Sequence, residues 1–197
     1  MRRLSAFSWI PILAIIAGLG FMLDPAQSQP TSDDDLAAQA GYVDFSGIDS
    51  WFDAEASTEV DIRGPLVNLV AQAAESSDPD FASMMGDVVA IQVRGYPLPE
   101  DRVKDIRSRT NQLAQSLEDS GWSRVIYVRE EGEQVSIYIQ KSGDRIAGLT
   151  LLSTKPGKES VYVNIVGSLS PDQIAALGRG LNVSALEQVD VSRNSPN

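Results

Sequence analysis

Apolar and polar residues alternate with a two-residue period through much of the second half of the chain, as in β-strands with one buried face. The clearest case is 134–140, where Val135, Ile137 and Ile139 share one side and the residues between them share the other. Segments rich in turn-forming residues separate these runs. The pattern predicts four consecutive strands in a meander, over 125–129, 134–140, 146–152 and 161–165.

The first half of the chain mixes helical spacing with shorter strand-like runs. Pro65 suits the first position of a helix, whose buried stripe is predicted from helical spacing to be Leu66, Leu69, Val70, Ala73 and Ala74. The elements expected in this half are a strand at 59–62, the helix from Pro65, a short helix at 78–85, a strand at 88–96 and a long helix at 100–119.

A last helix is expected after the meander. Ser170 and Gln173 form a capping box with Pro171 at the first helical position, and Ile174 and Leu177 would be its buried residues. Three further apolar residues would dock as a terminal segment: Leu181, Val183 and Leu186.

Strands in a consecutive run favour an antiparallel sheet that helices cover. The predicted fold class is therefore α+β. We expect a two-layer sandwich with a mostly antiparallel sheet of about five or six strands and helices packed on one face. Residues 41–190 would form this single domain, and residues 191–197 would be a disordered tail.

The first 28 residues have the pattern of a secretory signal peptide. Arg2 and Arg3 precede an apolar run from Trp9 to Leu23, and small residues at Ala26 and Ser28 suit cleavage after Ser28. The alternative is an uncleaved membrane anchor, although the apolar run is shorter than a spanning helix requires. Residues 29–40 would then form a flexible acidic linker. These features predict a periplasmic or secreted protein.

The amino-acid composition limits the catalytic and binding chemistry open to the protein. The chain has no histidine, which removes His-based triads, and no cysteine, which removes disulfides, thiolate chemistry and a lipid anchor at a cysteine. The net charge of −11 disfavours nucleic acid as a partner. We expect no cofactor and no metal. The membrane would be contacted only through the signal segment, if that segment is kept.

Three aromatic residues are candidates for an interaction surface. Tyr138 and Tyr162 fall on the outward side of neighbouring predicted strands, and Trp122 follows the long helix. Exposed aromatic side chains often mark partner sites. The alternative is structural: the tyrosines would pack across strands, and the tryptophan would close one end of the core.

Several short motifs, in their order and spacing, resemble the bacterial domain-of-unknown-function 4252 family. The resemblance runs from about Gly41 to Leu186 and rests on 41–45, 64–66, 120–122, 146–149, 161–167 and 170–173. It implies an α+β envelope protein, secreted or lipid-anchored in many members. The family has no established activity and no catalytic residues. Some members are encoded beside alternative sigma factors, which would suggest envelope-stress signalling.

The leading expectation is an exported, non-enzymatic binding or regulatory module of the cell envelope. Its partner would be an unknown envelope protein or another envelope component. One alternative is a hydrolase of cell-wall or glycan material, which needs two close carboxyl groups in a cleft. Another is an assembly factor that pairs through a sheet edge.

Cleavage after Ser28 predicts that the protein recovered from the periplasm begins at Gln29. The mass of the intact exported protein checks this. A protein that keeps Met1 and fractionates with the membrane would instead support the anchor.

Overall fold

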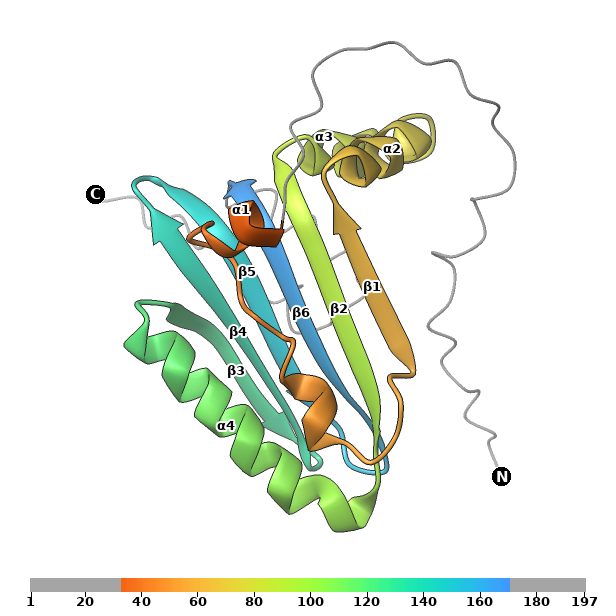
Figure 1. Ribbon diagram of the computed structural model, residues 1–197, viewed down its shortest axis with the longest axis vertical. Helices are drawn as coiled ribbons and strands as arrows, with labels where there is room; N and C mark the ends of the chain where they lie inside the picture. The colour runs from red at the N-terminus through yellow and green to blue at the C-terminus, as the bar shows by residue number, and fades with distance from the viewer. Residues whose placement is uncertain (1–32, 171–197) are drawn as a thin grey trace, which may run out of the picture.

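The computed structural model describes residues 33–170, which build one six-stranded antiparallel sheet with helices around it (Figure 1). The strand order is β1-β2-β6-β5-β4-β3. The strands are β1 (Thr58–Arg63), β2 (Val88–Leu98), β3 (Ser123–Glu130), β4 (Glu133–Ser142), β5 (Arg145–Thr154) and β6 (Lys158–Leu169). The helices are α1 (Asp33–Ala37), α2 (Pro65–Ala74), α3 (Pro79–Met85) and α4 (Val103–Asp119), with short 3-10 turns η1 (Ile48–Trp51) and η2 (Glu100–Arg102).

The predicted α+β class and antiparallel sheet are confirmed, and each strand predicted from alternation is present. The four strands of the meander, β3 to β6, pair in chain order. Strand β6 also pairs with β2, so that β5 and β6 are internal strands of the sheet. Turn residues act as expected, because Gly143 and Gly157 adopt positive φ angles of 59° and 67°. Asp78 caps α3 by accepting a hydrogen bond from the backbone N–H of Phe81 at 3.0 Å.

The sheet has one aliphatic face. Residues paired across neighbouring strands share a face, and one such row crosses all six strands without a polar residue. This row consists of Val60, Val93, Val163, Leu151, Ile137 and Ile126. The adjoining row contains Ile62, Ile91, Ile165, Leu149 and Ile139. We call this side of the sheet the aliphatic face.

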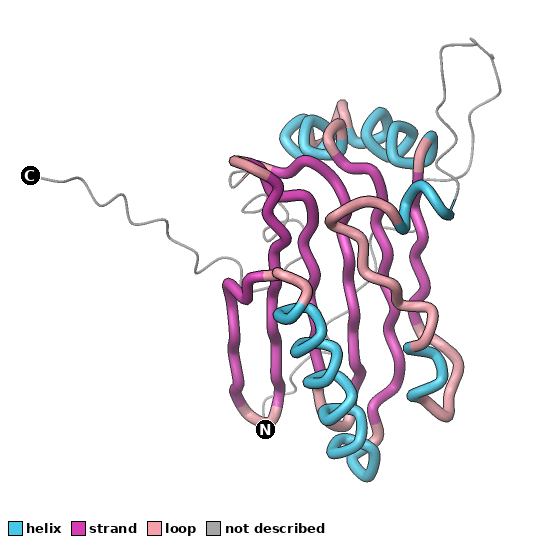
Figure 2. Tube along the Cα trace, turned by 60° about the vertical axis from the view of Figure 1, so that its left-hand side comes forward, coloured by secondary structure: helices cyan, strands magenta, loops and turns pink. Residues whose placement is uncertain are grey.

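The opposite side, here the polar face, has a different composition. Its rows carry amide, hydroxyl and phenol groups, and its central positions are Gln92, Asn164, Thr150, Tyr138, Tyr162, Leu152 and Ser136. These side chains are buried. Two segments lie over them: helix α4, and the N-terminal stretch 41–52 that contains η1 (Figure 2). The polar face is therefore an internal layer.

Helices α2 and α3 lie at one end of the sheet, near the start of β2, and contact the aliphatic face there (Figure 1). The buried stripe of α2 differs from the prediction. Leu66 and Leu69 are exposed, while Val67, Val70 and Ala71 contact the aliphatic cluster. Both stripes have helical spacing, so the sequence alone does not distinguish them.

The acidic linker predicted at 29–40 is wrong for its second part, because residues 33–37 form α1. Leu36 is 1% exposed and packs against Ala90 and Val166 on the polar face. One buried leucine among charged neighbours gives too weak a periodicity to detect in the sequence. The predicted signal peptide, tail and last helix lie outside the described residues.

Asn164 fixes the N-terminal stretch to the centre of the sheet. Its Oδ1 accepts a hydrogen bond from the backbone N–H of Val43, and its Nδ2 donates to the carbonyl of Gly41, both at 3.0 Å. Gly148 on the neighbouring strand permits this approach, because a Cβ there would lie 2.4 Å from the Gly41 carbonyl oxygen. Gly148 and Gly41 therefore form a close backbone contact that leaves no room for a side chain.

Gly148→Ala should lower the free energy of unfolding by about 1–3 kcal/mol or more, because the added methyl group collides with backbone that Asn164 holds in place. Chemical denaturation measures this. Gly47→Ala is the matched control: Gly47 has a φ of −85°, and a methyl group added there would have no atom within 4 Å. Its change should be neutral or stabilising by up to ~1 kcal/mol. Equal stability of the two variants would contradict the close-packing account.

Candidate functional site

The three residues predicted to form an interaction surface are internal. Tyr138 and Tyr162 are 0% exposed, and Trp122 is 6% exposed. They belong to one cluster with residues of 41–52 and α4, and the rings of Phe45, Trp51 and Phe52 surround Tyr162. The prediction of an exposed aromatic patch is therefore wrong. Alternation identified the correct face, but α4 and 41–52 cover it.

The three buried phenols have raised pKa values. Burial raises the pKa of Tyr162 and of Tyr138 above the ordinary value, and burial together with the hydrogen bond to Asp49 raises the pKa of Tyr96. Each phenol therefore stays protonated. The Tyr162 hydroxyl lies 2.9 Å from Thr110 Oγ1 on α4, which joins the helix to the centre of the sheet.

Two described carboxyl groups, those of Asp44 and Asp105, have clearly shifted pKa values. A glycoside hydrolase needs one carboxyl group with a raised pKa. In residues 33–170 the clear shifts are in the other direction: the Ser46 backbone N–H lowers the pKa of Asp44, and the hydrogen bond from Arg102 lowers the pKa of Asp105. Within the same residues, no three acidic side chains gather closely enough to hold a metal ion.

Two hollows on the described surface differ in size and in the charges that line them. The larger, of ≈560 Å³, lies beside α4 and mixes acidic Glu100 with basic Lys104 and Arg107. The other, of ≈310 Å³, lies between 39–41 and the end of the sheet, where Arg145 pairs with Asp87 at 3.3 Å. In the larger hollow, Arg107 donates from a terminal guanidinium nitrogen to the carbonyl of Gly132, while its Nε is buried without a hydrogen-bond partner among the described residues.

The exposed edge of β3 is the strongest candidate for a contact surface. Val125 is 50% exposed and Tyr127 is 46% exposed, and no further strand pairs with the outer side of β3 among the described residues. An edge strand with exposed apolar side chains can accept an added strand. The other edge, β1, is guarded by charge, since Glu59, Asp61 and Arg63 occupy alternate positions.

Two arginines give the β3 edge its charge. The guanidinium carbons of Arg124 and Arg129 lie 5.2 and 5.8 Å from the centre of the Tyr127 ring. Arg124 also pairs with Glu118 of α4 at 3.7 Å, and Arg129 donates to Gln134 at 2.9 Å. These contacts hold a cationic and aromatic group in place on a strongly acidic protein. We call Arg124, Val125, Tyr127 and Arg129 the β3 edge surface.

Sequence reasoning missed this surface. The strand was expected at 125–129, but a register shift between Arg124 and Ile126 turns Val125 outward. The sequence does contain a signal for the other three residues of the surface, because Arg124 lies three residues before Tyr127 and Arg129 lies two residues after it. Only the strand order makes β3 an edge.

Comparison with known proteins agrees with the family that the sequence motifs resemble. The family model of the domain of unknown function DUF4252 matches residues 51–177. The chain belongs to this family. The DUF4252 match covers the sheet and α2–α4, and is narrower than the resemblance from Gly41 to Leu186, since α1 and most of the stretch held by Asn164 precede it. No curated protein and no solved structure matches the chain.

Among the helices that the structure describes in this DUF4252 protein, none is both long and apolar enough to cross a membrane.

The Thr110–Tyr162 contact predicts non-additive stability. Thr110→Val and Tyr162→Phe should each lower the free energy of unfolding by ~1–2 kcal/mol, because each leaves a buried hydroxyl unpaired. The double variant should lose less than the sum, by at least ~0.5 kcal/mol, in chemical denaturation. Tyr127→Phe, on the exposed edge, is the control and should change little. Additive losses at positions 110 and 162 would mean that the two hydroxyls do not stabilise one another.

Proposed function

We propose that this DUF4252 protein is an exported, non-enzymatic binding module of the bacterial envelope, and that the β3 edge surface is its contact site. The single observation that carries the proposal is an eight-residue edge strand whose outward residues include half-exposed Val125 and Tyr127. Edge strands of this kind bind extended segments by adding a strand to the sheet.

The chemistry of the chain supports binding over catalysis. Histidine and cysteine are lacking throughout the sequence, and the buried phenols of the described core stay protonated. Recognition needs only shape, backbone hydrogen bonds and surface charge, all of which the β3 edge offers.

The two sides of β3 specify the partner segment. Ile126 and Val128 face the aliphatic side, while Tyr127 and Arg129 face the polar side. A strand added outside β3 would place its alternate residues beside these two sets. The best match is an extended segment that alternates apolar with acidic residues, whose carboxylates would meet Arg124 and Arg129.

Export and a role in envelope-stress signalling are part of the proposal. They are supported by the basic N-terminus followed by an apolar run, and by the resemblance to secreted family members. Loss of the gene should then change envelope-stress transcription. A transcript profile unaltered under several envelope stresses would count against the regulatory role.

The binding surface is tested by capture from a periplasmic extract with the tagged mature protein, followed by mass spectrometry. Tyr127→Asp combined with Arg129→Glu should weaken retention of the partner ~30-fold or more, since it removes an aromatic anchor and reverses a charge. Leu69→Asp is the matched control, because Leu69 is similarly exposed but lies on α2.

Strand addition makes a second, specific prediction for the purified pair. Backbone amides on the outer side of β3 should exchange with solvent more slowly in the complex, as new hydrogen bonds protect them. A partner that binds the edge variant as well as the native protein, or that leaves β3 exchange unaltered, would refute the proposed site.

A further inference from the structure

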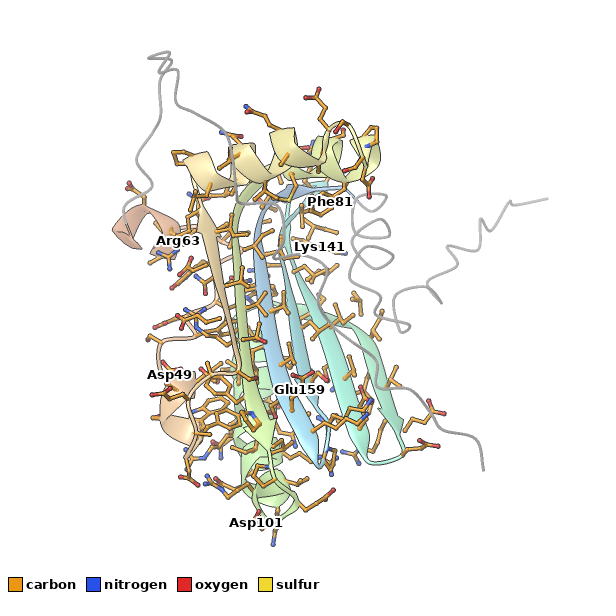
Figure 3. All side chains as sticks on the ribbon, turned by 90° about the vertical axis from the view of Figure 1, so that its right-hand side faces the viewer. Asp49, Arg63, Phe81, Asp101, Lys141 and Glu159 are labelled. Atoms are coloured by element: carbon orange, nitrogen blue, oxygen red, sulfur yellow. The ribbon has the colours of Figure 1, made fainter. Side chains whose placement is uncertain are left out.

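The hollow of ≈560 Å³ lies between the N-terminal half of α4 and two turns of the sheet. Besides residues of α4, Glu100 of η2 and Pro156 of the turn between β5 and β6 line it. The turn between β3 and β4 is adjacent, because the carbonyl of Gly132 accepts a hydrogen bond from Nη2 of Arg107, a lining residue. The hollow is therefore at the end of the sheet near Asp101, opposite the end where α2 and α3 lie (Figure 3).

The guanidinium group of Arg107 is only partly hydrogen-bonded. Its Nε is buried and has no hydrogen-bond partner among residues 33–170, and a buried donor without an acceptor is costly. In arginine, the N–H of Nε and one N–H of Nη2 point to the same side, so that the two oxygens of a carboxylate can accept from both. The single carbonyl oxygen of Gly132 accepts from Nη2 alone. A carboxylate on this side would satisfy the donor that the protein leaves unpaired.

Other hydrogen-bond donors line the same hollow. Lys104 is exposed and forms no ion pair with the described residues, and Ser108 adds an exposed hydroxyl. Asn111 accepts a hydrogen bond at its Oδ1 from Nε2 of Gln134 at 3.0 Å, which leaves its Nδ2 to donate. Spacings of three and four residues place all four donor residues on one side of α4: Lys104, Arg107, Ser108 and Asn111.

The charges of the hollow favour a ligand with one negative charge. Lys104 and Arg107 are positive, and Glu100 is the acidic residue of the lining. One negative charge on a ligand balances this set, whereas Glu100 would repel a dianionic phosphate more strongly. Val103 and Pro156 supply apolar surface beside the charged groups. A small organic acid with one carboxylate and a short apolar part matches both features.

We propose that this hollow is a binding site for a small organic monocarboxylate. The carboxylate accepts hydrogen bonds from Nε and Nη2 of Arg107, takes the place of the Gly132 carbonyl there, and pairs with Lys104. The site shares no residue with the β3 edge surface, so either site can fail its test without affecting the other.

Titration of the ¹⁵N-labelled full chain with butyrate at constant ionic strength tests the proposal by NMR. The Nε–H resonance of Arg107 and the backbone N–H of Gly132 should shift together, with half-saturation at about 1–10 mM, because so small a ligand gains limited binding energy. Butyramide, a neutral molecule of similar shape, should shift neither resonance. Shifts that do not saturate, or that butyramide reproduces, would overturn the proposal.

Two substitutions separate this site from general charge, with binding followed at the Gly132 amide. Arg107→Lys keeps the charge but removes the paired donors, and should weaken butyrate binding about tenfold or more. Lys104→Gln should weaken it about threefold or more. Lys141→Gln is the matched control, because Lys141 is also exposed but lies at the other end of the sheet (Figure 3). Equal weakening by Lys104→Gln and Lys141→Gln would overturn the proposed site.

Inorganic phosphate tests the class of ligand. At a pH where phosphate is a dianion, it should bind at least about tenfold more weakly than butyrate, and Glu100→Gln should reduce this difference. Phosphate that binds the native protein more tightly than butyrate would overturn the assignment to a monocarboxylate.

Discussion

The antiparallel register of the six strands is the constraint on which the rest of the structure depends. It brings Val60, Val93, Val163, Leu151, Ile137 and Ile126 into one row, and places amide, hydroxyl and phenol groups on the reverse side. A slip of one residue between any two strands would exchange these faces. Segments 41–52 and α4 cover the polar face, and α2 and α3 contact the aliphatic face at one end.

The polar face receives its cover through directional bonds. Asn164 holds the backbone of Gly41 and Val43, and Thr110 joins α4 to Tyr162. Such bonds fix where a segment lies, since an unpaired buried polar group is costly. The aliphatic face offers no hydrogen-bonding groups to fix a position, and α2 and α3 contact it through apolar side chains alone.

The two edges of the sheet differ in the residues that they present. Charged residues guard β1, whereas β3 presents Val125 and Tyr127 between two arginines. The aromatic residues of the core, including Tyr138 and Tyr162, hold α4 and 41–52, whereas Tyr127 lies on the surface. If the β3 edge surface is the contact site that we propose, changes there alter binding without disturbing the core.

The sequence by itself determined the elements, their order and the two-sided character of the strands, because period, turn glycines and caps are local properties. It also determined which chemistry is unavailable, since that depends only on residue types. Tertiary structure alone decided which face of the sheet α4 covers, which of two apolar stripes α2 buries, and which strand lies at the edge. These outcomes depend on contacts between residues distant in the chain, such as Asn164 with Val43, and alternation is the same whether a helix or solvent lies over a face.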